Sequence, residues 1–88
     1  MLKQSLTIQN KLGLHTRAAA RLVDLTKKFS SQVEITYRER TVDSKSIMGV
    51  ITLGAQKDDV VDVYVNGVDE EEALTAIKTL VDQKFGED

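Results

Sequence analysis

The only histidine of this 88-residue chain, His15, lies in the stretch KLGLHTRAAA, where the pattern predicts that a loop becomes a helix. At the start of a helix several backbone N–H groups lack an intrahelical acceptor, and together with the helix dipole they favour an anion. Arg17 can add a planar guanidinium that matches phosphate oxygens. A nucleophilic imidazole beside such a site is suited to accepting a phosphoryl group. A lone histidine is nevertheless more often an ordinary N-cap or surface residue, and spacing alone favours that interpretation.

Ser46 is the second residue whose type and position suggest chemistry. It precedes the apolar run IMGVITL, so Ser46, or Ser44 just before it, can cap a short helix. A phosphate on Ser46 would also meet a helix N-terminus, which makes it a candidate phosphorylation site. Serine caps are common, so capping alone would account for this residue.

Several other kinds of chemistry have little support in the sequence. The chain has no cysteine, which excludes thiolate catalysis and zinc–thiolate sites, and its carboxylates do not cluster with the lone histidine as metal ligands or as a triad. We therefore expect no metal and no cofactor. A net charge of −2 and two tyrosines as the only stacking candidates on strands argue against nucleic-acid binding. There is no signal peptide and no apolar run of about 20 residues, so we expect a cytoplasmic protein without membrane insertion.

The remaining pattern predicts the elements that must position these residues. Apolar and polar residues alternate in four segments, which predicts strands over residues 1–9, 32–37, 40–42 and 60–65. Helical spacing predicts helices over residues 16–28, 47–53 and 70–85, the last with a capping-box-like start at Asp69 and an end at Gly86. The order β-α-β-β-α-β-α, with one apolar face per strand, predicts a single α+β domain over residues 1–88. Its mostly antiparallel sheet would carry helices on one side.

The motifs GLHTRAA and KSIMGVITLGA, with the length and element order, resemble the histidine-containing phosphocarrier (HPr) family of the bacterial phosphoenolpyruvate-dependent phosphotransferase system. The resemblance implies an open-faced β-sandwich, with four antiparallel strands in the order 1-4-2-3 under three helices. It also implies that His15 takes a phosphoryl group on Nδ1 (pros) from phosphorylated enzyme I and passes it to enzyme IIA domains. Arg17 and the amides of Thr16 and Ala18 would bind the phosphate. Ser46 would be the regulatory serine modified by HPr kinase/phosphorylase.

The resemblance further implies a partner-docking surface near His15, made of Leu14, Ala20, Ile47, Met48 and Ile51. From the residues alone this set is either core or an apolar patch, and for Ile51 the core is favoured. Such a protein is a monomeric phosphoryl carrier and not a stand-alone catalyst. The alternative is a purely regulatory binding module that acts through Ser46.

One residue departs from the family pattern, because Ala18 stands where proline is usual. Alanine leaves the start of the helix less rigid and adds one free amide. The lead-in NKLGLH and the ending KFGED are similar to the nitrogen-branch paralogue of the family. The output may thus be regulation more than sugar transport in this chain's host, and the sequence leaves both branches open.

Overall fold

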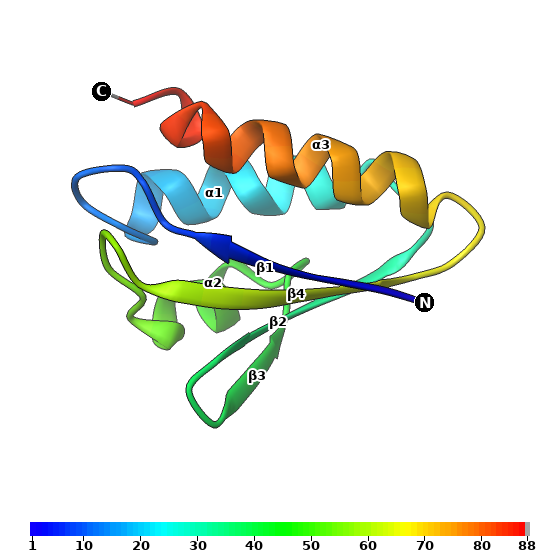
Figure 1. Cartoon of the computed structure of the whole chain (residues 1–88), viewed down its shortest axis with the longest axis horizontal. Coiled ribbons are helices and arrows are strands. Elements are labelled where there is room, and N and C mark those ends of the chain that lie inside the picture. The colour runs from blue at the N-terminus through cyan, green and yellow to red at the C-terminus, as the bar shows by residue number, and fades with distance from the viewer. Residues whose placement is uncertain (88) are drawn as a thin grey trace.

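The computed structural model describes residues 1–87, which form one four-stranded antiparallel sheet with helices on one face (Figure 1). The strand order is β1-β4-β2-β3, and the predicted α+β class and sheet order are confirmed. None of the helices in this part of the chain is long and apolar enough to cross a membrane. In chain order the elements are β1 (Leu2–Thr7), α1 (Thr16–Thr26), β2 (Gln32–Tyr37), β3 (Arg40–Asp43), α2 (Ile47–Leu53), β4 (Val60–Asn66), α3 (Glu70–Asp82) and the 3₁₀ turn η1 (Lys84–Gly86).

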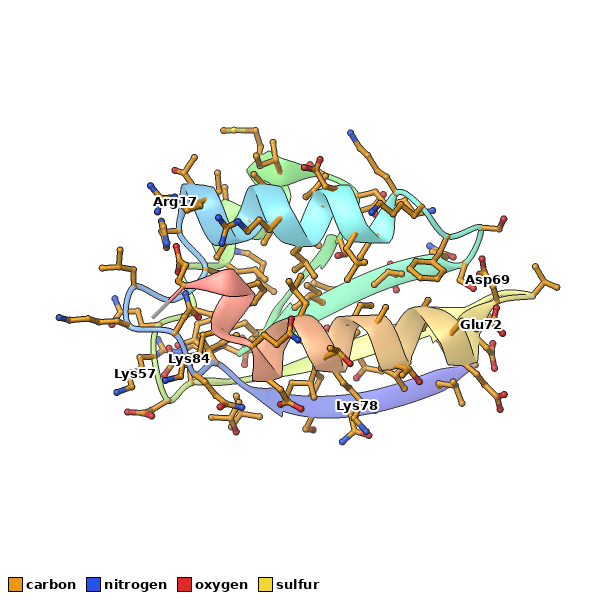
Figure 2. All side chains as sticks on the ribbon, turned by 90° about the horizontal axis from the view of Figure 1, so that it is seen from above. Arg17, Lys57, Asp69, Glu72, Lys78 and Lys84 are labelled. Carbon is orange, nitrogen blue, oxygen red and sulfur yellow. The ribbon has the colours of Figure 1, made fainter. Side chains whose placement is uncertain are left out.

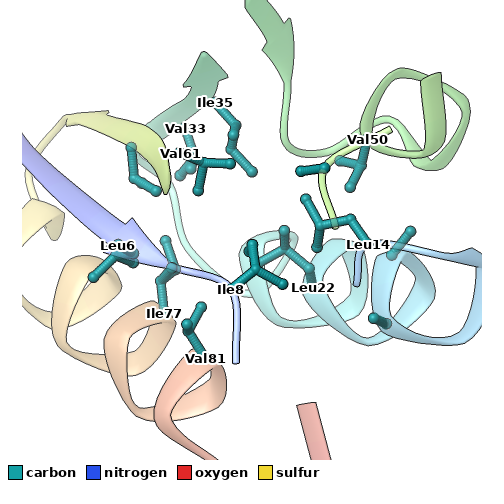
Figure 3. Packing of buried hydrophobic residues seen from close by; sticks show 14 of the residues in the cluster. Leu6, Ile8, Leu14, Leu22, Val33, Ile35, Val50, Val61, Ile77 and Val81 are labelled. Carbon is teal, nitrogen blue, oxygen red and sulfur yellow. The ribbon is translucent and has the colours of Figure 1, made fainter. Parts of the chain in front are cut away.

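Strand β4 lies in the middle of the sheet, between β1 and β2. Its β-branched residues Val61, Val63 and Val65 alternate with polar ones, and all three are buried under the helices. The register sets Leu6 opposite Val61 and Ile35 opposite Val63, so apolar side chains of neighbouring strands meet on the same face. This face forms the floor of the core shown in Figure 3.

Helices α1 and α3 lie side by side over the sheet and run in opposite directions (Figures 1 and 2). The small residues Ala18 and Ala19 of α1 are fully buried, and α3 buries Ala73, Ile77 and Val81. Burial of these apolar stripes, worth roughly 25 cal/mol per Å² of apolar surface, holds both helices on the sheet. Because the helices are antiparallel, the start of α1 and the end of α3 lie at the same end of the molecule.

The last helix ends earlier than the sequence predicts. Helix α3 stops at Asp82, and the turn η1 follows with positive φ angles at Lys84 and Phe85. Phe85 is 0% exposed. Continuing the helix would aim this ring differently, so burial of an aromatic side chain outweighs the cost of the left-handed backbone.

The predicted capping box at the start of α3 is wrong. Asp69 is the N-cap residue, but its carboxylate makes no cap hydrogen bond within the helix. It accepts hydrogen bonds from the backbone N–H groups of Ser30 (2.8 Å) and Ser31 (2.9 Å) in the α1–β2 connection. A contact between two loops, invisible to local spacing, has replaced the local cap.

Candidate functional site

A tight loop after β1 delivers His15 to the start of α1. Gly13 has a φ of 71°, and a Cβ atom there would lie 2.5 Å from the carbonyl oxygen of Ala55, so only glycine fits. The amide of Leu14 donates to the same Ala55 oxygen at 2.9 Å. The Asn10 side chain closes the loop by donating from Nδ2 to the Gly13 carbonyl at 2.7 Å.

His15 is the N-cap residue of α1, with extended backbone angles and a carbonyl that accepts from the amide of Ala19 at 2.8 Å. Its side chain makes no cap hydrogen bond and is 30% exposed. By helix geometry the amides of Thr16, Arg17 and Ala18 have no intrahelical acceptor. The imidazole therefore lies beside three backbone donors at the positive end of a helix dipole, where the sequence predicts it.

Glu87 contacts the other side of His15, and the sequence analysis missed it. The Nε2 atom of His15 lies 2.8 Å from Oε2 of Glu87, and Nδ2 of Asn10 donates to Oε1 of Glu87 at 2.9 Å. The Glu87 side chain is only 12% exposed. A signal existed in the element order, because an antiparallel final helix must return the chain end to the start of α1.

Glu87 is held in its ionised form. Burial opposes its charge, but hydrogen bonds from Asn10 and His15, with the nearby charges of His15 and Arg17, outweigh burial and lower the pKa of this carboxyl below its ordinary value. The site thus contains a fixed carboxylate that faces an imidazole nitrogen.

Two shallow hollows flank the histidine loop. One, of about 460 Å³, is lined by the cations Lys11 and Arg17 together with Leu12, Gly86 and Glu87. Arg17 is exposed and lies at the end of the molecule where α1 begins and α3 ends (Figure 2). The other hollow, of about 280 Å³, lies between the start of α1 and the end of α2. Its lining residues are Leu12, Leu14, His15, Thr16, Ile51, Gly54, Ala55 and Gln56.

The sequence-predicted docking residues divide into surface and core. Met48 is 66% exposed and Ile47 is 37% exposed on α2, while Ala20 and Ile51 are partly exposed. Leu14 differs from the expectation, because it is 3% exposed and belongs to the hydrophobic core. Its amide bond to Ala55 turns it inward, so it supports the hollow from below and offers little area to a partner.

Ser46 caps α2, which settles the choice between the two serines. Its Oγ accepts a hydrogen bond from the Gly49 amide at 3.2 Å, whereas Ser44 is fully buried. Ser46 is exposed at the surface. The neighbouring Lys45 directs its ammonium to the Phe29 carbonyl at 2.9 Å.

Other polar clusters have less to offer. A hollow of about 600 Å³ beside the β2–β3 turn has its polar groups already engaged, since Tyr37 donates to Asp59 at 2.6 Å and Arg40 donates to the Thr52 carbonyl at 2.9 Å. Within residues 1–87 no three histidine, cysteine, aspartate or glutamate side chains gather as a metal site would require.

Comparison with known proteins agrees with this arrangement. The family model described as "PTS HPr component phosphorylation site" matches residues 2–83. The phosphocarrier protein HPr of Cupriavidus necator is 47% identical over 87 residues, which cover 99% of this chain and 98% of the relative. A solved structure of HPr-C-His from Thermoanaerobacter tengcongensis has a TM-score of 0.96 and 43% identity, and the match covers 100% of this chain and 99% of that one.

A second solved structure, an HPr dimer from the same organism, has a TM-score of 0.79 and 44% identity over 99% of this chain and 100% of that one. The expectation of a monomer therefore stays a prediction. Fold, length and motifs match from end to end, and the chain belongs to the HPr phosphocarrier family of the phosphotransferase system.

Proposed function

We propose that this chain carries a phosphoryl group on Nδ1 of His15, taken from phosphorylated enzyme I and passed to enzyme IIA domains in the cytoplasm. One observation carries the proposal. His15 is the N-cap of α1 and is partly exposed at the edge of a hollow, beside three amides that lack an intrahelical acceptor.

The chemistry follows from this geometry. The lone pair of Nδ1 attacks phosphorus, the P–Nδ1 bond forms, and the bond to the donor breaks with its electron pair leaving on the donor. Charge on the phosphoryl oxygens is offset by the amides of Thr16 and Ala18 and by the guanidinium of Arg17. The chain alone supplies no donor, so it acts as a carrier between two partners.

The exposed apolar residues beside the site supply the proposed docking surface, which we call the α2 patch: Ala20, Ile47, Met48 and Ile51. Methionine adapts its shape to different partners, which suits a carrier that must meet at least two. The patch is small, so partners should bind weakly and exchange quickly.

The test is incubation with phosphoenolpyruvate and enzyme I. We expect an acid-labile phosphate on the wild-type chain and its loss in His15→Ala. Ser46→Ala is the control and should label fully. Full labelling of His15→Ala would contradict the proposal, and an acid-stable label lost only in Ser46→Ala would support the purely regulatory alternative.

Phosphorylation of Ser46 by an HPr kinase/phosphorylase is the proposed regulation. Ser46 is exposed, and a dianion there would lie next to Ile47 and Met48 of the α2 patch. It would repel an acidic partner and desolvate poorly in an apolar interface. We expect the phosphoserine form to receive the phosphoryl group on His15 more slowly than the unmodified form, and equal rates would refute this regulation.

A further inference from the structure

We propose that Glu87 is a positioning residue that sets which nitrogen of His15 can accept the phosphoryl group. By accepting a hydrogen bond from Nε2–H, Glu87 holds the ring proton on Nε2 and leaves the lone pair on Nδ1. This inference deepens the proposed function and rests on it, because the choice of nitrogen matters only if His15 is the phosphoryl acceptor.

The contact itself requires this tautomer. A neutral imidazole has one N–H, and an ionised carboxylate can only accept. With Nε2 of His15 at 2.8 Å from Oε2 of Glu87, the proton must therefore lie on Nε2. A carboxylate that orients a histidine by accepting from one ring nitrogen, while the other reacts, is the logic of hydrolase triads.

Glu87 is in turn fixed by Asn10, which is 0% exposed. The Nδ2 group of Asn10 has two hydrogens, and it donates to the Gly13 carbonyl at 2.7 Å and to Oε1 of Glu87 at 2.9 Å. A flipped amide would set two carbonyl oxygens against each other at Gly13, so Asn10 can offer Glu87 only a donor. Its own Oδ1 is buried without a hydrogen-bond partner, a cost consistent with the amide being held in this one orientation.

The chain end that carries Glu87 is itself tied down. Phe85 is fully buried, and its carbonyl accepts a hydrogen bond from the guanidinium of Arg21. The amides of Gly86 and Glu87 close two turns at 2.9 Å, onto the carbonyls of Gln83 and Lys84. Anchoring of this kind holds the carboxylate in place on folding and not on partner binding.

The same contact fits the course of the transfer. When Nδ1 takes the phosphoryl group, no proton leaves the ring, which keeps Nε2–H and gains a formal positive charge. The Glu87 carboxylate offsets that charge while the donor keeps the electron pair of the broken bond. When the group moves on to the next acceptor, the pair of the P–Nδ1 bond returns to Nδ1 and the starting tautomer is restored.

Substitution of Glu87 by glutamine gives a sharp test, because the amide has one acceptor and one donor end. Asn10 presents a donor, so the new carbonyl oxygen must face Asn10 and the new NH₂ group must face Nε2 of His15. Nε2 would then accept, and the ring proton would move to Nδ1 and block attack. Glu87→Gln should therefore phosphorylate more slowly than Glu87→Ala, although glutamine is closer to glutamate in shape.

The measurement is ¹⁵N NMR of the His15 ring in the full chain at a pH where the ring is neutral. We expect Nε2–H in the wild type, a mixture of tautomers in Glu87→Ala and Nδ1–H in Glu87→Gln. Transfer from phosphorylated enzyme I should be slower by roughly tenfold or more in Glu87→Gln, the factor that one hydrogen bond of ordinary strength commands. Glu72→Gln is the matched control, an exposed carboxylate at the opposite end of the molecule (Figure 2), and should change neither signal nor rate.

The outcomes separate this inference from the proposed function. If Glu87→Gln keeps the proton on Nε2, or if both Glu87 variants accept the phosphoryl group at the wild-type rate, the positioning role is overturned even when His15 is labelled. If the tautomers respond as expected but the wild-type His15 is never labelled, the proposed function fails and the positioning of the ring stands.

Discussion

At the scale of single residues, His15 is served by groups from three distant parts of the chain. The first turn of α1 supplies acceptor-free amides, the β1–α1 loop supplies Asn10, and the chain end supplies Glu87. Each group has one task, since the amides face an anion, Asn10 orients Glu87, and Glu87 orients the ring. Loss of any one of these groups should therefore have its own signature.

Ala18 gives the first prediction at this scale. It is the third residue of α1, so its amide has no intrahelical acceptor and the carbonyl four residues earlier lies outside the helix. Ala18→Pro should thus be tolerated and should raise the free energy of unfolding by up to about 1 kcal/mol, mainly by restricting the unfolded chain. Urea unfolding measures this change, and labelling of His15 should persist because the amides of Thr16 and Arg17 remain.

The next residue provides the control. The amide of Ala19 donates to the His15 carbonyl at 2.8 Å, so Ala19→Pro removes a helix hydrogen bond and should lower the free energy of unfolding by about 3 kcal/mol. A loss of stability in Ala18→Pro as well would show that the buried site has no room for the ring.

At the scale of elements, the loop between β1 and α1 depends on Gly13. In Gly13→Ala the new Cβ would meet Ala55 and Gln56 backbone atoms at 2.5 and 2.7 Å, and the residue would keep a positive φ. We expect a loss of more than about 1–3 kcal/mol, the cost of a left-handed non-glycine residue alone, and slower labelling because His15 follows this loop. Urea unfolding and the labelling rate measure both effects.

Gly54 separates strain from collision. It has nearly the same φ, 70°, but a Cβ there would meet nothing within 4 Å. Gly54→Ala should therefore cost only the conformational term, about 1–2 kcal/mol, and less than Gly13→Ala. Equal losses in the two variants would show that contact with Ala55 adds nothing.

At the scale of the whole molecule, lowered carboxyl pKa values make the fold sensitive to acid. The hydrogen bond from the Ser31 hydroxyl, with those from the Ser30 and Ser31 amides, lowers the pKa of Asp69, and similar bonds from Tyr37 and the Gln56 amide lower that of Asp59. A carboxyl with a lowered folded-state pKa stabilises the fold above its unfolded value. This stability is lost as the pH falls through the folded value.

Asp69 is the residue to test, because it connects the α1–β2 and β4–α3 loops. In urea unfolding between pH 7 and pH 2, stability should fall below about pH 4, and Asp69→Asn should flatten that fall. Asp24→Asn removes the same charge from an exposed position on α1 and should leave the slope unchanged. A slope that Asp69→Asn does not alter would contradict the role given to these loop contacts.

Local pattern was enough to predict the element types and much of the site. The alternation in β4 and the helical spacing of α1 each depend on a few neighbouring residues, and so does the cap at Ser46. His15 at a helix start follows from the same local reading. The errors fall where a distant partner competes with a local one, as when Asp69 bonds Ser30 and Ser31 and when Phe85 ends α3 to reach the core.

The sequence by itself determined the helix that His15 caps, because strand and helix periodicities are properties of neighbouring residues. Only the tertiary structure decided which group faces the ring on its other side, since His15 and Glu87 are 72 positions apart. Their contact exists because α1 and α3 pack antiparallel on one face of the sheet and burial of Phe85 fixes where the chain ends. Packing of the core thus converts a histidine at a helix start into one whose reactive nitrogen is assigned by a carboxylate.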